Sequence, residues 1–358
     1  MANKHVNLDA LFADIADAIR EKTGETDSIV ADDFPDVIRE RLQVIPTIPY
    51  LTFSSPSSFT LRVNDTTKHW DGTLEYSTDT STWSTWDGTT TLSSATSGSD
   101  NVLYLRGTGN TVITGNSSNY NWVLTGSNIA CIGNIENLLD YATVESGAHP
   151  TMKMYCYYYM FDGCTSLIQA PALPATKLAE DCYFGMFSGC TALTQAPALP
   201  ATTLKYYCYR SMFKGCTSLT QAPALPATTL VTGCYTSMFN RCTSLTKAPS
   251  ELPATTLATE CYKFMFEFTA ITAIPRIMAT TYATDSCKGM FDDVKTLNVY
   301  SSSEPGHEYG WTAPASTYCS GMFGSDDGES EWAKLDGSNF PNSGTPTEGV
   351  TYYFATVD

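Results

Sequence analysis

One segment of this chain, FKGCTSLTQAPALPATTL at 213–230, recurs almost unchanged at 187–204 and at 161–178. A Met-Phe pair marks the register, and its spacing is 26 residues for the first intervals and then 27, 25 and 32. Repeats of this length predict a solenoid, in which each repeat buries its apolar face only against its neighbours. We number repeats 1 to 7 by their Met-Phe pairs, which begin at Met160, Met186, Met212, Met238, Met265, Met290 and Met322.

Repeat 3 illustrates the expected packing. Leu219, Ala222 and Leu225 are predicted to point inward from an extended segment, and Leu230 to close the far corner. Prolines lack the N–H that a strand ladder needs, so the two prolines of this segment should confine strand pairing mostly to 218–222. The opposite wall is expected to consist of Cys208, Met212, Phe213 and Cys216, with the two cysteines about 12 Å apart if the stretch between them is helical.

Most of the 12 cysteines follow the repeat. Cysteines at equivalent places of stacked units have parallel Cβ vectors, whereas a disulfide needs converging ones, so buried reduced thiols are favoured over bridges. No Cys-x-x-Cys or His pairing indicates zinc, and no cofactor site is expected. The two structural rows are Cys156, Cys182, Cys208 and Cys234, and Cys164, Cys190, Cys216 and Cys242.

The repeat resembles the leucine-rich repeats of the BspA type, whose approximate pattern aFxxCxsLxxIxLPxxvxxI is similar to MFKGCTSLTQAPALPATTL here. The resemblance covers about 180 residues, assigned within a solenoid domain at 121–325. Ala222 stands where the pattern has Ile, Pro223 precedes the turn, and a CY-x-x-MF box replaces the usual Ile-Gly turn. The resemblance implies surface adhesion and ligand binding without catalysis.

The first 45 residues predict a small helical unit with one apolar face. The stretch LFADIADAIREKTGETDSIVADDFPDVI resembles the N-terminal segment of many phage and prophage structural proteins, which implies attachment to a virion. Packing of this face onto the next domain is an alternative to docking or oligomerisation. The predicted anchor residues are Leu8, Leu11, Phe12, Ile15 and Ile19.

Residues 46–120 alternate apolar and polar positions between turn clusters, which predicts a small Ig-like β-sandwich spacer. The predicted strand runs end with NVLYLRG and NTVITG. Trp83 and Trp86 are either a sugar-stacking pair or packing residues. The segment NIACIGNIENLLDY at 128–141 is expected to be an atypical first rung of the solenoid, and 326–358 a C-terminal cap.

Comparison of the copies within the chain separates constant from variable positions. The constant tyrosines are expected to form a stacked row, and Gln169, Gln195, Gln221 and Lys247 an outward ladder. The residues beside the constant tyrosines vary, and several are Tyr, a residue favoured in recognition surfaces. These variable positions are either unconstrained surface or a binding face. The ligand-binding candidates are Tyr155, Tyr158, Tyr159, Tyr206, Tyr207, Arg210 and Lys263.

The net charge and the absence of catalytic motifs argue against several classes of function. The net charge of -17 disfavours nucleic acid and anionic membranes as partners. The four histidines are scattered and no catalytic motif is present, so no enzyme activity is expected. The loop GSDDGESEW at 324–332 is acidic but lacks the ligand spacing of a Ca²⁺-binding EF-hand loop.

The sequence as a whole predicts a mainly β chain with a short N-terminal helical segment, a β-sandwich and a BspA-like solenoid. We expect a bacteriophage virion protein of the tail fibre, head fibre or decoration type, oligomeric in the particle and joined to other virion proteins. Its partner would be a host-surface or mucosal glycan or protein. The alternatives are a purely structural virion component and a non-viral bacterial surface adhesin.

Overall fold

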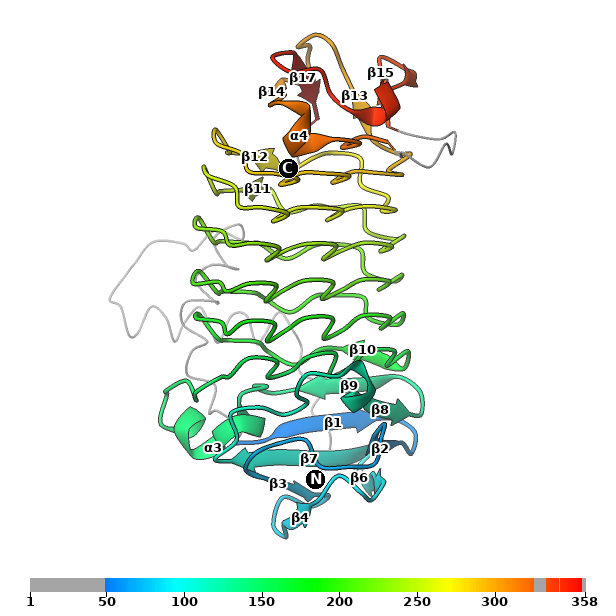
Figure 1. Ribbon diagram of the computed structural model, residues 1–358. Coiled ribbons are helices and arrows are strands. Elements are labelled where there is room, and N and C mark those ends of the chain that lie inside the picture. Colours follow the sequence, from blue (N-terminus) through cyan, green and yellow to red (C-terminus); the bar gives the residue numbers. More distant parts are fainter. Residues whose placement is uncertain (1–48, 325–332, 341, 356–358) are drawn as a thin grey trace, which may run out of the picture. The chain divides into compact units, whose positions relative to one another are not determined.

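A computed structural model describes residues 49–324, 333–340 and 342–355, which belong to one unit of the chain, Ile48–Asp358. The anchor residues between Leu8 and Ile19 and most of the acidic loop lie outside the described residues. The described part is mainly β with few helices, which confirms the predicted class. Figure 1 shows the repeats, green to yellow, stacked one upon another between the N-terminal strands and the C-terminal segment.

Two sheets make up the N-terminal part. The larger has the strand order β10-β9-β1-β7-β3-β4 with β6 also paired to β7, and the smaller has the order β5-β2-β8. The strands are β1 (Leu51–Ser55), β2 (Thr60–Val63), β3 (Thr73–Ser77), β4 (Ser84–Trp86), β5 (Leu92–Ser93), β6 (Ala95–Ser97), β7 (Asp100–Thr108), β8 (Trp122–Thr125), β9 (Ile129–Ile132) and β10 (Leu167–Gln169). The short helix η2 (Ser118–Tyr120) precedes β8, and α3 (Asn137–Glu145) follows β9.

Tryptophans fill the space between the two sheets. The Trp86 ring of β4 lies 5.5 Å from the Trp122 ring of β8 and 5.1 Å from Trp70. Trp86 is therefore a core residue, and the hypothesis that it forms a sugar-stacking pair with Trp83 is wrong. Trp83 packs separately, under the Arg106 guanidinium at 4.0 Å from the ring centroid.

The strand domain does not end at residue 120. β8 pairs with β2 and β9 pairs with β1, both antiparallel, while β9 also pairs with β10 of repeat 1 in parallel. The ring of Trp122 lies 6.1 Å from Phe161, the first phenylalanine of the repeats. The strands and the repeats therefore share one hydrophobic core, and the sheets cover the first repeat as a cap.

The stretch around Ile113 differs from the predicted strand NTVITG. The carboxylate of Asp71 accepts hydrogen bonds from the amides of Thr111 and Val112 and turns the chain. The amide of Ile113 then donates to the carbonyl of Cys156 in repeat 1. These residues therefore pair with the repeats rather than with a sheet.

The CY-x-x-MF segments carry most of the backbone bonding between repeats. In repeat 2, alternate amides donate to carbonyls of repeat 3, and the amides between them close turns within repeat 2. The donors to repeat 3 are the amides of Tyr183, Gly185, Phe187 and Gly189. The stretch between Cys208 and Cys216 is thus a run of turns and not a helix. The dihedral φ is positive at every fourth residue, for example at Tyr207 (53°), Ser211 (54°) and Gly215 (73°).

The proline-bearing segments pair only sparsely. Gln221 forms an isolated bridge with Lys247, and β11 (Glu251–Leu252) pairs in parallel with β12 (Arg276–Ile277). The prediction that pairing is concentrated at 218–222 is wrong, because the CY-x-x-MF segment contains no proline and offers a donor at every second residue. Leu219, Ala222 and Leu225 are buried as predicted.

The C-terminal part covers the last repeat. Phe323 of repeat 7 contacts Phe340, at a ring distance of 4.9 Å, and Phe354, at 5.7 Å. The elements here are β13 (Asn298–Val299), β14 (Tyr309–Thr312), α4 (Ser316–Cys319), β15 (Lys334–Leu335), β16 (Ser338–Asn339), η3 (Asn342–Gly344) and β17 (Thr351–Phe354).

Candidate binding surface

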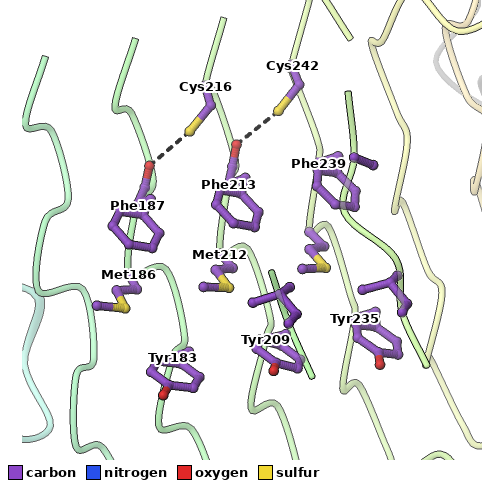
Figure 2. Close-up of a cluster of buried hydrophobic side chains, with 14 of the residues drawn as sticks. Tyr183, Met186, Phe187, Tyr209, Met212, Phe213, Cys216, Tyr235, Phe239 and Cys242 are labelled. Carbon is purple, nitrogen blue, oxygen red and sulfur yellow. Dashed lines mark hydrogen bonds between the residues drawn. The ribbon is translucent and has the colours of Figure 1, made fainter. Parts of the chain in front are cut away.

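The inward residues of the CY-x-x-MF segments form continuous rows (Figure 2). The ring centroids of Tyr183 and Tyr209 are 5.8 Å apart with planes 11° from parallel, and those of Phe187 and Phe213 are 5.7 Å apart at 7°. Offset stacks of this kind stabilise beyond the area they bury. The constant tyrosines therefore belong to the core.

The second cysteine row has a role that the sequence did not reveal. The thiol of Cys216 donates to the carbonyl of Phe187 at 3.1 Å, and Cys242 donates to Phe213 at 3.0 Å (Figure 2). Burial raises the pKa of the Cys242 thiol to about 12. All 12 cysteines are buried and unpaired, so they are protonated core residues.

The turn geometry gives the CY-x-x-MF segment an inside and an outside. In repeat 1, Cys156 and Tyr157 are buried, the next two residues are half-buried, and Met160 and Phe161 are buried again. In repeats 2 and 3 the first of the two outward positions, at Phe184 and Arg210, is again half-buried, whereas the second holds a small buried residue, Gly185 or Ser211. The variable positions identified in the sequence are therefore the outward ones.

Aromatic side chains from neighbouring repeats touch on this outward face. The Tyr158 ring lies 4.8 Å from Tyr159, 5.3 Å from Tyr155 and 5.0 Å from Phe184 of repeat 2. The Arg210 guanidinium of repeat 3 lies 5.3 Å from both the Phe184 and Tyr207 rings. We call Tyr155, Tyr158, Tyr159, Phe184, Tyr207 and Arg210 the outer aromatic cluster.

Phe184 links the two halves of this cluster, yet it was not among the sequence candidates. The sequence signal that could have identified Phe184 is its position in the repeat. In repeat 2 it occupies the position that Tyr158 holds in repeat 1 and Arg210 in repeat 3. Tyr206 precedes Tyr207 and is 52% exposed, and none of the ring contacts among the described residues joins it to the cluster.

Lys263 does not belong to this cluster. It lies in repeat 5, where its ammonium contacts the Glu260 carboxylate at 2.6 Å and the Asp285 carboxylate at 3.7 Å. The structure thus brings together Tyr155, Tyr158, Tyr159, Tyr207 and Arg210 and separates Lys263, which forms a local ion-pair network.

Asp181 lies among these groups at 8% exposure. Burial, together with the neighbouring Glu180 carboxylate, raises the pKa of Asp181 to about 6, while Arg210 acts in the opposite direction. The cluster therefore combines ring faces with a guanidinium donor and lies beside a buried carboxyl group whose pKa is about 6.

Several outward aromatics lie over glycines of the following repeat. The Tyr159 ring covers Gly185, the Tyr207 ring covers Gly233, and a Cβ built at either glycine would overlap the ring. Both tyrosines have positive φ, at 51° and 53°. In these two pairs the absence of a Cβ at the glycine leaves room for the tyrosine ring of the preceding repeat.

Other candidate features are weaker. Gln169, Gln195, Gln221 and Lys247 are exposed, as expected for an outward row. Among the described residues, no group of His, Cys, Asp and Glu side chains is arranged to hold a metal ion, and no helix is long and apolar enough to cross a membrane.

Three comparisons were made, with protein-family models, with curated proteins and with solved structures, and none of them gives a match to this chain.

Proposed function

We propose that this chain is a bacteriophage virion protein that displays a BspA-like leucine-rich repeat solenoid and adheres to a host-surface or mucosal ligand, a glycan or a protein. The outer aromatic cluster is the proposed contact surface. The observation that carries the binding role is the continuity of this cluster over repeats 1 to 3, from Tyr155 through Phe184 to Tyr207.

The chemistry of the cluster supports recognition. Tyr and Arg are enriched among residues that dominate binding energy, because they offer a large area and directional hydrogen bonds at a modest loss of side-chain entropy. The cluster residues are half-buried and hold one another, so less freedom remains to be lost on binding. Ring faces also suit the apolar face of a sugar, and the Arg210 guanidinium suits its hydroxyls.

The solenoid assignment is supported by the repeat-to-repeat backbone bonds and the stacked rows of Tyr and Phe. The BspA resemblance departs from its pattern in the CY-x-x-MF box, which is the segment that forms the outward face. The adhesive surface of this chain would therefore consist of residues of the CY-x-x-MF box, which differs from the family pattern, and not of the leucines that match it.

The virion assignment rests on the resemblance of the N-terminal stretch LFADIADAIREKTG, residues 11–24, to phage structural proteins. It is tested by immunogold labelling of particles released from the bacterium that encodes the chain. Gold on intact particles is expected, together with its loss when residues 1–45 are deleted. Gold confined to the cell envelope would overturn the assignment and favour a bacterial adhesin.

A purely structural virion component is the competing function. It predicts that the outward aromatic residues are exchangeable without loss of adsorption to host cells. The present proposal predicts that their exchange abolishes adsorption while particles still assemble.

A further inference from the structure

A pocket of about 590 Å³ lies where the loop after α3 meets the proline-bearing segments of repeats 1 and 2. Its lining includes Glu136, His149, Met152, Lys177, Leu178 and Lys205. None of these residues belongs to the outer aromatic cluster. The volume is in the range of about 300–1,000 Å³ that small-molecule sites occupy.

A buried carboxylate forms one wall of the pocket. The Glu136 side chain is 2% exposed, and it accepts a hydrogen bond from His149 Nδ1 at 2.8 Å. The side chain of His149 is 50% exposed. Since Nδ1 is engaged by Glu136, Nε2 is the ring nitrogen that remains for a ligand.

Two lysines in the lining depart from the repeat pattern. The position of Lys177 is Thr203 in the next repeat and Thr229 in the one after it, and the position of Lys205 is Ala179 in repeat 1 and Val231 in repeat 3. At these two positions the chain has a lysine beside the pocket and an uncharged residue in the neighbouring repeats. The two cations are conspicuous because the net charge of the chain is -17.

We propose that this pocket binds a small sugar carrying a single carboxylate, of the uronic acid or sialic acid class. Lys177 and Lys205 would neutralise and hold the carboxylate, while Met152 and Leu178 contact the apolar face of the ring. The buried negative charge of Glu136 disfavours a dianion, so a phosphorylated sugar should bind more weakly. This site is independent of the proposed adhesive cluster.

The test is isothermal titration of the full chain with D-glucuronate, N-acetylneuraminate, D-glucose and D-glucose 6-phosphate. At least one of the two carboxylated sugars should bind at least tenfold more tightly than either glucose or glucose 6-phosphate. Equal binding of all probes, binding of none, or a preference for glucose 6-phosphate would overturn the proposal.

Matched variants locate the binding. Lys177→Thr and Lys205→Ala introduce residues that the chain itself uses at equivalent positions, so the fold is retained, and together they should weaken carboxylate binding at least tenfold. Lys247→Gln removes a lysine from the exposed Gln row in the same way and should change nothing. Unchanged binding in the double variant would exclude the pocket. Arg210→Thr should also leave the binding of the carboxylated sugar unchanged, which distinguishes the pocket from the outer aromatic cluster.

Discussion

The ring of Tyr207 lies directly over Gly233 of the next repeat, and a Cβ at Gly233 would overlap the ring edge. The same relationship joins Tyr159 to Gly185 and Phe264 to Gly289. Each of these three aromatics is therefore matched to a glycine 25 or 26 residues later in the chain. Variation at the outward positions is thus coupled between neighbouring repeats rather than free.

Gly233→Ala should destabilise the chain by more than Gly163→Ala. Both glycines have positive φ, at 63° and 71°, which costs an L-residue about 1 kcal/mol, but only Gly233 is covered by a ring, whereas Gly163 faces open space. The ring overlap should add about 1–3 kcal/mol. Urea unfolding measures both.

Tyr207→Ser supplies the control for this pair, because Ser211 already holds positive φ in the same repeat. In the Tyr207→Ser background, Gly233→Ala should cost no more than Gly163→Ala. Equal effects of Gly233→Ala with and without Tyr207 would contradict the coupling.

Loss of the hydroxyl should affect the free energy of unfolding differently at two stacked tyrosines. Tyr157 donates to the carbonyl of Ile135 at 3.2 Å, whereas the buried Tyr183 hydroxyl has no partner among the described residues. Tyr157→Phe should lower the free energy of unfolding by about 1 kcal/mol, and Tyr183→Phe should leave it unchanged or raise it. Denaturant unfolding of the two variants decides this, and a comparable loss in both would count against the packing described.

Asp181 should make stability depend on pH. Its pKa in the folded protein is about 6, above the ordinary value of 3.8, so the folded state binds its proton more tightly than the unfolded chain. The resulting stabilisation is complete below pH 3.8 and is lost as pH rises through about 6.

Asp181→Asn should therefore raise the free energy of unfolding at pH 7 by about 2 kcal/mol, with a difference that shrinks towards pH 4. Asn tolerates the positive φ of this position, so the backbone is not a confounding change. Parallel stability curves for the wild type and the variant between pH 4 and pH 7.5 would contradict the assignment.

The cysteines should be inert in the folded protein and free in the unfolded one. Burial raises the pKa of thiols such as Cys208 well above the ordinary value of 9.0, so the reactive thiolate is scarce. In native buffer a thiol reagent should react only slowly with the cysteines. In denaturant without reductant, the same reagent should titrate all 12 cysteines. Recovery of few or no thiols would show that bridges form and would contradict the row packing.

The core of the repeats was predictable from the sequence because repetition removes ambiguity. Leu219, Met212 and Phe213 recur in register, and stacked copies must place them at equivalent depths. The run of turns was not predictable, because its positive φ angles occur at Tyr, Ser, Asp and Glu as well as at Gly. Backbone bonds between repeats hold these residues in a conformation that their own preferences disfavour.

The sites depended on contacts that local patterns do not contain. Phe184 joins the outer aromatic cluster only because repeats 1, 2 and 3 lie in register, whereas the sequence candidates are Tyr, Arg and Lys residues at the variable positions. The sequence leaves Trp86 open between sugar stacking and packing, because its burial depends on Trp122, which follows the boundary assigned at residue 120. Non-local strand pairing placed both in one core.

The central claim is that the repeated residues form the scaffold and the outer aromatic cluster binds. The most direct measurement is binding of the full chain to an array of bacterial and mucosal glycans and to host cells, compared with the variant Tyr158→Thr, Phe184→Thr, Arg210→Thr. Repeat 4 carries Thr236 at the same position, so these exchanges fit the fold.

The control carries Lys263→Thr and Lys288→Thr, which make the same exchange in repeats 5 and 6. We predict binding by the wild type and the control and at least a tenfold loss in the triple variant. Binding that survives in the triple variant, or no binding by the wild-type chain to any cell or glycan, would contradict the claim.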